Sequence, residues 1–397
     1  MTISDLGRAA LGVTAVVAML AGCGSREPIG APGAAPNSLT RQAESVSPKG
    51  VVEYAYVTNE NVNNISGFSI NATTGALTPV SGSPFATKTS PIGIAVDPAG
   101  KFVYAANANL KNVSGYSISA STGALTPVPG SPFTAGSHPV AVAVDPKGLF
   151  AYVPNVADST VSAYTINASK GALTPVAGSP FVTGSSPQFA AVDPQGNYLY
   201  VSNVASNNIS AYTINANSGA LTPVTGSPFA AGAFPFSVTI DANGKFAYVA
   251  NDRSNNVSAY TINATTGALT PVSGSPFATG TNPVTVNVDP KGLFAYVSGN
   301  EDGNVSAYAI NQTTGALTQV SGSPFTAGSE AYGVSVEPSD MFVYAVACGR
   351  NAVFGYAINA KTGALTPVSG SPFTTGAFPE EIATCRVART VCKPPPL

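Results

Sequence analysis

A small number of side chains in this sequence have the type and position that acid–base chemistry requires. His138 is the only histidine in the chain, and histidine is the usual general base near neutral pH. Glu330 could act as a second acid or base, and the Arg350 guanidinium could stabilise a developing oxyanion. We predict these three as catalytic residues, with an uninvolved surface-loop histidine as the alternative for His138. Four further residues are predicted to contact a ligand: Gln188, Arg253, Tyr332 and Glu380.

The sequence predicts neither a metal site nor a cofactor site. A zinc site is disfavoured because the chain has one histidine and no paired cysteine spacing of the kind that zinc sites use. A Ca²⁺ ion held by carboxylates on a molecular axis stays open.

Several other motifs that resemble reactive sites are repeated, and the repetition argues against catalysis. The serine of Gly-Ser-Pro-Phe occurs seven times, for example as Ser83, whereas a nucleophile needs one copy activated by an adjacent base. The aspartate of the Asp-Pro strings, such as Asp97, is typical of a turn. Asn-x-Ser strings such as Asn112-Val113-Ser114 resemble glycosylation acceptors, but we interpret them as turn asparagines of a repeating unit.

The repeating unit is 48 residues long and occurs seven times without insertion or deletion. The string Gly-Ala-Leu-Thr begins at Gly75, Gly123, Gly171, Gly219, Gly267, Gly315 and Gly363. A tyrosine recurs at Tyr56, Tyr104, Tyr152, Tyr200, Tyr248, Tyr296 and Tyr344. An array of this kind indicates a repeat architecture.

Each unit contains four short alternating or apolar runs separated by turn signals. In the unit that begins at Pro139 the runs are 140–144, 150–153, 161–166 and 172–176, and Asp-Pro-Lys-Gly between the first two suits a type I turn. Four antiparallel strands per 40 to 50 residues are typical of a propeller blade. We therefore predict an all-β, seven-bladed β-propeller.

The two ends of the array predict a closed ring rather than an open solenoid. The first unit starts at its second strand, near residues 52–57, and lacks a first strand. Residues 379–385 follow the seventh unit and match the first-strand columns, so they can complete the first blade. Closure also removes exposed sheet edges. The predicted propeller spans residues 51–385, with a tail at 386–397.

Function is expected on the face where the seven copies differ. In a four-stranded meander the loops that enter the first strand share a face with the loops between the second and third strands, and this face carries the irregular residues. Just before the recurring proline the chain reads Ser90, His138, Ser186, Phe234, Asn282, Glu330 and Phe378. Just after it the chain reads Ile92, Val140, Gln188, Phe236, Val284, Tyr332 and Glu380. These residues should surround the mouth of the central channel.

The N-terminal segment resembles a bacterial lipoprotein signal. Residues 9–22 form an apolar run that is shorter than the roughly 20 residues of a membrane-spanning helix. The run ends in Leu-Ala-Gly-Cys, which resembles the lipobox, with Cys23 as the lipidated residue. We predict a signal peptide at 1–22, a flexible tether at 23–50 and a protein exported to the cell envelope through a lipid anchor in the membrane. An ordinary secretory peptide is the alternative.

Outside the cytoplasm the remaining cysteines can form a disulfide. Three are left after Cys23: Cys348, Cys385 and Cys392. We favour a Cys385–Cys392 bridge because both lie in the C-terminal segment, and spacing leaves Cys348 open as a partner.

Composition excludes two broad classes. The chain has 17 Lys+Arg and 19 Asp+Glu among 397 residues, with a net charge of −2, so no electrostatic footprint for nucleic acid is present. A hydrophobic content of 44% supplies enough apolar surface for a folded core, which argues against disorder.

The repeat itself resembles a known family. Tyr56-Val57-Thr58-Asn59, the Asp-Pro-x-Gly turns and the seven-fold count are similar to the YVTN-repeat propellers and the related lactonase family, which includes a 6-phosphogluconolactonase-like branch. The resemblance covers residues 51–385. It implies the propeller fold and, as an expectation, lactone hydrolysis.

Three functions follow from these observations. We favour a monomeric binding or interaction module at the cell envelope, because the blades are nearly identical and ionisable residues are few. Its partner would be a small molecule, such as a sugar or lactone, or a protein at the propeller face. The alternative is a lactonase that hydrolyses a sugar lactone, although export conflicts with a phosphorylated cytoplasmic substrate. A surface-layer structural protein is the third.

Overall fold

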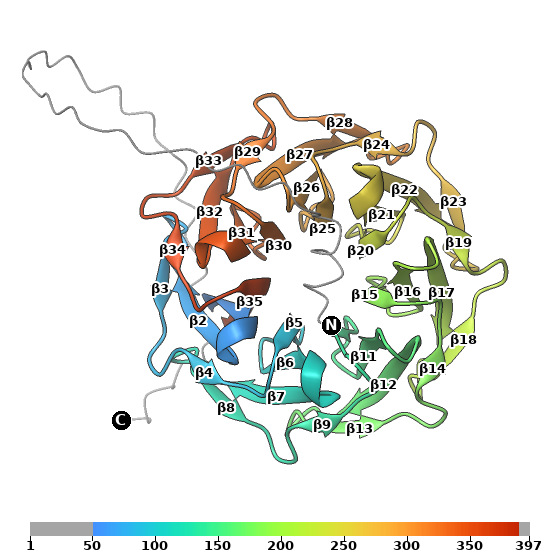
Figure 1. Cartoon of the computed structure of the whole chain (residues 1–397), viewed down its shortest axis with the longest axis horizontal. Helices are drawn as coiled ribbons and strands as arrows, with labels where there is room; N and C mark the ends of the chain where they lie inside the picture. The colour runs from blue at the N-terminus through green and yellow to red at the C-terminus, as the bar shows by residue number, and fades with distance from the viewer. Residues whose placement is uncertain (1–50, 389–397) are drawn as a thin grey trace, which may run out of the picture. The chain divides into compact units, whose positions relative to one another are not determined.

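Seven antiparallel sheets surround a central axis in the computed structural model, which describes residues 51–388 (Figure 1). The predicted seven-bladed propeller with four strands across each blade is thereby confirmed. Cys23, the signal peptide, the tether and Cys392 lie outside the described residues. Within 51–388, no helix has the length and hydropathy needed to cross a bilayer.

Each blade runs outward from an innermost strand. In blades 1 to 7 the innermost strands are β35 (Pro379–Ala388), β5 (Pro91–Val96), β10 (Ala143–Val144), β15 (Pro187–Val192), β20 (Pro235–Ile240), β25 (Pro283–Val288) and β30 (Ala331–Val336). The second strands are β1 (Val51–Asn59), β6 (Phe102–Asn107), β11 (Phe150–Asn155), β16 (Tyr198–Asn203), β21 (Phe246–Asn251), β26 (Phe294–Gly299) and β31 (Phe342–Ala347). The third strands are β2 (Asn64–Ile70), β7 (Asn112–Ile118), β12 (Thr160–Ile166), β17 (Asn208–Ile214), β22 (Asn256–Ile262), β27 (Asn304–Ile310) and β32 (Ala352–Ile358).

The outermost position of each blade holds two short strands instead of one. The first pieces are β3 (Leu77–Pro79), β8 (Leu125–Pro127), β13 (Leu173–Pro175), β18 (Leu221–Pro223), β23 (Leu269–Pro271), β28 (Leu317–Gln319) and β33 (Leu365–Pro367). The second pieces are β4 (Phe85–Ala86), β9 (Phe133–Thr134), β14 (Phe181–Val182), β19 (Phe229–Ala230), β24 (Phe277–Ala278), β29 (Phe325–Thr326) and β34 (Phe373–Thr374). In blade 3, for example, β13 and β14 both pair with β12, at its two ends.

The serine of Gly-Ser-Pro-Phe lies in the loop between these two pieces and has a structural role. Its hydroxyl oxygen accepts a hydrogen bond from a backbone N–H of the third strand, as Ser179 does from Ala163 at 2.9 Å. The same bond recurs in every blade. The Asp-Pro aspartates likewise serve turns, because Asp97 Oδ1 accepts from the backbone N–H groups of Lys101 and Phe102. Both motifs therefore have structural roles in the blade, as the repetition predicts.

Blade 3 departs from the predicted inner strand. The sequence predicts residues 140–144, whereas β10 covers Ala143–Val144 and a single isolated bridge joins Pro139 to Asn155. The cause is Pro154 in the neighbouring strand, because proline has no N–H with which to continue the ladder. The start of this strand therefore pairs less than in the other blades.

Tyrosines join each blade to the next and complete the ring. The hydroxyl of Tyr56 donates to the Gly123 carbonyl at 2.8 Å, and the six equivalent tyrosines make the same bond at 2.7–3.1 Å. In the last of these bonds Tyr344 of blade 7 donates to Gly75 of blade 1. All seven tyrosines of this column are fully buried.

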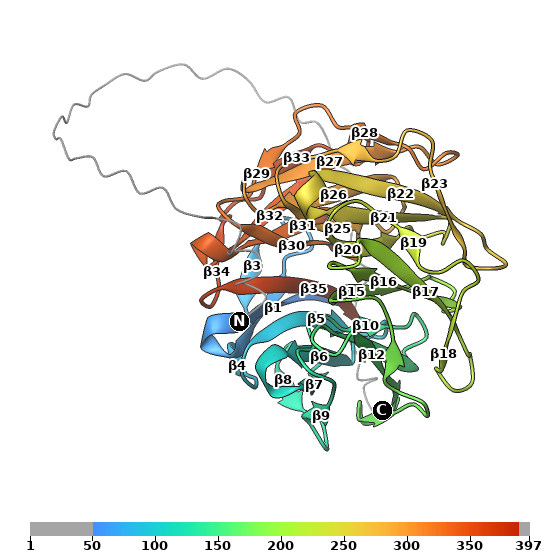
Figure 2. The same cartoon turned by 45° about the vertical axis from the view of Figure 1, so that its right-hand side comes forward.

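The C-terminal strand closes blade 1, as predicted. β35 pairs antiparallel with β1, and the two strands lie side by side in both views (Figures 1 and 2). The strand continues to Ala388, three residues beyond the predicted end of the propeller, so the predicted tail boundary at 386 is wrong. Residues 386–388 stay in the strand because Arg386 pairs across the ladder with Glu53 and Val387 is buried.

Candidate functional site

The predicted mouth loops do meet on one face of the ring. The residue before the proline column has a left-handed backbone in all seven blades, with φ between 51° and 60°. Its carbonyl accepts an N–H from the neighbouring loop; Val156 donates to His138 and Cys348 donates to Glu330. Four of these neighbouring loops contain a 3₁₀ turn: η1 (Glu60–Val62), η2 (Ala108–Leu110), η3 (Asp252–Ser254) and η4 (Cys348–Arg350). Side chains at these positions are therefore held rigidly at the mouth.

His138 lies half-buried in this ring. Burial lowers the pKa of His138 from its ordinary value, and the nearby Glu60 carboxylate opposes the shift. Glu60 is itself buried and accepts a 2.7 Å hydrogen bond from the Ser90 hydroxyl. The imidazole is thus uncharged at neutral pH, which is the state that a general base requires.

Glu330 and Arg350 lie in blade 7, and the structure does not bring them together with His138 in blade 3. Both side chains are exposed. The ion pairs found among residues 51–388 join Lys291 to Asp340 and Arg386 to Glu53, so neither Glu330 nor Arg350 belongs to one. Within residues 51–388 no ion pair links the three predicted catalytic residues, and their joint role stays a prediction.

The predicted ligand residues are divided between the surface and the channel. Arg253 is exposed and stacks on the Phe234 ring, with its guanidinium carbon 4.2 Å from the ring centroid. Gln188 and Glu380 are buried. Tyr332 reaches from blade 7 to the Phe236 ring of blade 5, edge to face, with centroids 5.7 Å apart. This aromatic pair covers part of the channel mouth.

Carboxylates lie close to Tyr332 and Cys348 at the mouth. Burial raises the pKa of Tyr332 well above its ordinary value, and carboxylates of Glu380, Asp252 and Glu60 raise it further. The pKa of the Cys348 thiol is also raised, by burial first and then by Glu380 and Glu330. Both groups therefore stay protonated.

The two described cysteines are buried thiols, not nucleophiles. The Cys348 sulfur donates to the Pro379 carbonyl at 2.6 Å. Burial raises the pKa of Cys385 to about 12, so the thiol stays protonated. Both are free thiols in the described part of the chain. The predicted bridge from Cys385 stays a prediction because its partner, Cys392, lies outside that part.

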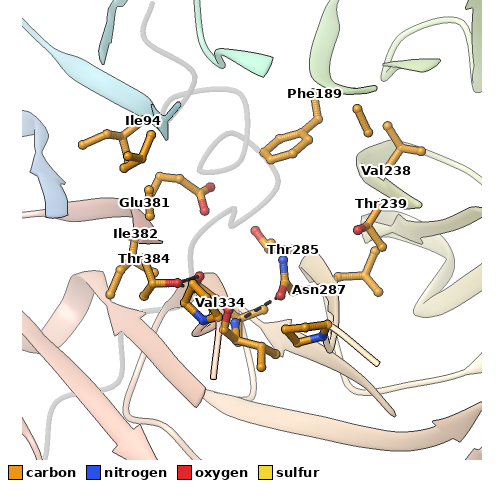
Figure 3. Close-up of a pocket in the computed structure, with 18 residues that line it drawn as sticks. Ile94, Phe189, Val238, Thr239, Thr285, Asn287, Val334, Glu381, Ile382 and Thr384 are labelled. Atoms are coloured by element: carbon orange, nitrogen blue, oxygen red, sulfur yellow. Dashed lines mark hydrogen bonds between the residues drawn. The ribbon is translucent and has the colours of Figure 1, made fainter. Parts of the chain in front are cut away.

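The inner strands line a cavity of about 480 Å³, together with Pro290 and Pro338 of the turns that follow β25 and β30, so the cavity lies toward the face opposite the mouth loops (Figure 3). Hydrogen bonds between blades hold its wall. Asn287 Oδ1 accepts the backbone N–H of Val336 at 3.1 Å, and the hydroxyls of Ser335 and Thr384 lie 3.0 Å apart. Because these bonds join blades 6, 7 and 1, that side of the cavity is rigid.

Of the residues between 51 and 388 that line the cavity, Glu381 is the one ionisable residue. Its side chain extends into the cavity (Figure 3), and its backbone N–H donates to the Thr58 hydroxyl at 3.3 Å. Glu381 is half-buried, and this burial raises the pKa of its carboxyl to about 8. A carboxyl that titrates near neutral pH in a cavity is a candidate acid–base group.

The sequence prediction missed Glu381 and chose its neighbour Glu380. A signal was present, because the equivalent residues in the other blades are Gly93, Ala141, Phe189, Ser237, Thr285 and Gly333, none of them charged. Adjacent residues of a strand point to opposite sides. The choice between the two glutamates therefore needed the orientation of β35.

Among residues 51–388, no group of three or more His, Cys, Asp or Glu side chains is arranged to hold a metal ion.

A family comparison decides the relationship of the chain. The family described as lactonase, 7-bladed beta-propeller matches residues 37–142, 133–279 and 290–387. The chain belongs to this family. None of the curated proteins compared with the chain matches it.

Solved structures of other lactonase-like propellers share this fold. A Bacteroides uniformis protein provisionally assigned as a 6-phosphogluconolactonase has 21% identity and a TM-score of 0.74, with 85% of this chain and 100% of that chain covered. The periplasmic gluconolactonase of Pseudomonas aeruginosa has 17% identity and a TM-score of 0.71, with 84% and 99% covered. A Bacteroides fragilis protein assigned like the first has 21% identity and a TM-score of 0.74, with 85% and 98% covered. At these identities the similarity shows the fold.

Proposed function

We propose that this lactonase-family propeller hydrolyses a lactone in its channel, with Glu381 as the general acid–base residue. The observation that carries the proposal is a carboxyl group with a pKa of about 8 that faces a cavity of about 480 Å³. Family membership supports the lactonase alternative over the binding module that the composition favours. The gluconolactonase of the same fold supports it as well.

The chemistry needs few groups. Ionised Glu381 would take a proton from a water molecule as its oxygen attacks the lactone carbonyl carbon. The side-chain nitrogen of Asn287 can donate to the oxyanion that forms, since its oxygen is already occupied by Val336 N–H. Collapse of the intermediate breaks the bond from the carbonyl carbon to the ring oxygen, and Glu381 returns the proton to that oxygen. Water and lactone thereby give one hydroxy acid.

The pH dependence follows from the raised pKa. As a base, Glu381 must be ionised, so kcat/KM should rise with pH and reach a plateau above about pH 8. The lowered pKa of His138 places its own titration below that range. The rise near pH 8 should therefore report Glu381 and should disappear in Glu381→Gln.

The experiment compares wild type and Glu381→Gln on a panel of lactones by pH-stat titration of the acid released. We expect kcat/KM to fall about 10²-fold or more in the variant, without loss of folding, because glutamine resembles the protonated carboxyl. Glu301→Gln removes an exposed carboxylate of the loop face and is the matched control. Equal activity in wild type and Glu381→Gln would refute the assignment. If wild type binds a lactone without hydrolysing it, the hypothesis of a binding module would be favoured instead.

The remaining sequence predictions stay proposals. We propose export and a lipid anchor at Cys23, and a monomer in solution. His138 and Arg350 remain candidates at the mouth, and His138→Asn and Arg350→Ala belong in the same assay. Activity that falls in these variants but not in Glu381→Gln would move the site to the mouth.

A further inference from the structure

We infer that the substrate of this site is an uncharged lactone with an apolar arm, and not a phosphorylated or otherwise anionic lactone. The inference rests on the proposed function. It concerns the same cavity, and it follows from the charge and the division of polarity of its wall.

The cavity offers nothing to neutralise an anion. Among the described residues, its lining contains no lysine, arginine or histidine, and the single ionisable group is the acid Glu381. An anionic group buried there would lose its hydration without gaining a cationic partner, which is costly. Once Glu381 ionises, as the proposed chemistry requires, the two negative charges would also repel each other.

The wall of the cavity has a polar side and an apolar side. Blades 6, 7 and 1 contribute the polar groups Thr285, Asn287, Ser335, Thr384 and Glu381 beside seven apolar residues, and blade 5 adds Thr239. Blades 2, 4 and 5 face them largely with hydrocarbon, and Figure 3 shows Ile94, Phe189 and Val238 on that side. This division fits a substrate with its lactone carbonyl at Glu381 and Asn287 and an apolar arm against Phe189. A cavity of about 480 Å³ is within the size range of pockets for ligands larger than a single ring.

Three probes separate these properties: N-hexanoyl homoserine lactone is uncharged with an apolar arm, glucono-δ-lactone is uncharged without one, and 6-phosphogluconolactone is a dianion at neutral pH. We expect kcat/KM for the first to exceed that for the second by about tenfold or more, which is the scale of discrimination by a hydrophobic pocket. Turnover of the third should lie at the background rate.

Two variants test the physical cause. Phe189→Ala should lower kcat/KM for the acyl lactone about tenfold and leave that for glucono-δ-lactone within about twofold. Thr239→Lys places a cation in the wall and should raise turnover of 6-phosphogluconolactone at least tenfold, whereas Thr239→Met, of similar length and no charge, should not.

The outcomes distinguish this inference from the proposed function. If wild type prefers 6-phosphogluconolactone or glucono-δ-lactone and Glu381→Gln abolishes that activity, the inference is overturned and the proposed function stands. If no probe is hydrolysed by wild type, both are overturned. If Thr239→Lys and Thr239→Met have the same effect on the phosphorylated probe, charge is not the cause of the selectivity and the inference fails.

Discussion

Replacing Glu53 by glutamine should stabilise the protein at alkaline pH, because Glu53 is a buried carboxyl at the ring closure. Glu53 lies opposite Arg386 in the β1–β35 ladder, and the arginine Nε and Nη2 atoms are each 3.0 Å from Glu53 Oε1. Oε2 is buried without a hydrogen-bond donor among the described residues. Burial, and then the neighbouring Glu337 carboxylate, raise the pKa of Glu53 to about 7, against the opposing effect of Arg386.

The sign and size of the expected change in stability follow from the linkage between protonation and folding. The folded state holds the Glu53 proton more tightly than the unfolded state, whose pKa is near 4.5. The contribution of Glu53 to the free energy of unfolding is therefore highest below pH 4.5. It falls between pH 4.5 and about 7 and is constant above that range. A shift from 4.5 to about 7 corresponds to about 3 kcal/mol at 1.36 kcal/mol per unit.

Glutamine at position 53 remains uncharged at every pH. Its amide nitrogen can donate to Glu337 and its oxygen can accept from Arg386. Glu53→Gln should therefore match wild type near pH 4 and exceed it by about 2–3 kcal/mol at pH 8. Urea unfolding followed by tyrosine fluorescence suits the chain, which has 16 Tyr and no Trp.

The difference in the free energy of unfolding between wild type and Glu53→Gln, followed against pH, reports the titration of Glu53. Burial also raises the pKa of Asp289 to about 6, but Asp289 titrates in both proteins and its contribution cancels. Glu301→Gln, at an exposed position, serves as the control for removing one negative charge. Stability curves of wild type and Glu53→Gln that run parallel from pH 4 to pH 8 would refute the reasoning.

Four further measurements test the remaining parts of the structure. If His138 is a base, His138→Ala and His138→Asn should both lower lactone kcat/KM about 10²-fold. Asparagine is included because it tolerates the left-handed backbone at this position. Full activity in both variants would exclude a role for His138 as a base. Tyr344→Phe should cost about 1 kcal/mol in urea unfolding, the worth of one hydrogen bond between blades; no change would mean that this bond adds nothing to closure. Deleting residues 379–397 should lower the thermal midpoint far more than deleting 24–45, and equal midpoints would contradict closure by β35. Cys23→Ser should release a folded protein from membranes, and continued membrane association would disprove the anchor.

The sequence alone predicts the propeller because the repeat carries the interactions that build it. The tyrosine column supplies one hydrogen bond at each boundary between blades. The Asp-Pro aspartate and the Gly-Ser-Pro-Phe serine each accept hydrogen bonds from backbone N–H groups of their own blade. The exceptions arise where one residue changes the ladder. Pro154 removes one donor and shortens β10, and Arg386 extends β35 because Glu53 faces it.

The site is less predictable because it depends on distances around the ring. The sequence places His138 in the third repeat and Glu330 and Arg350 in the seventh, but it cannot give the distances between their side chains across the channel. It also cannot assign Glu381 to the cavity, because the pKa of that carboxyl depends on how inner strands from several blades enclose it.

Two departures from seven-fold repetition, Glu381 and Arg386, lie in the strand that closes the ring, and this links stability to the proposed chemistry. β35 carries Glu381 into the cavity and, five residues later, Arg386 into the closing pair with Glu53. A ligand that binds beside Glu381 contacts a strand that must remain docked for the ring to stay closed. Binding to the closed form alone stabilises it by RT ln(1 + [L]/Kd), about 2.7 kcal/mol at a ligand concentration of 100 Kd. The strand that completes the fold is therefore also the one through which occupancy of the cavity stabilises the ring.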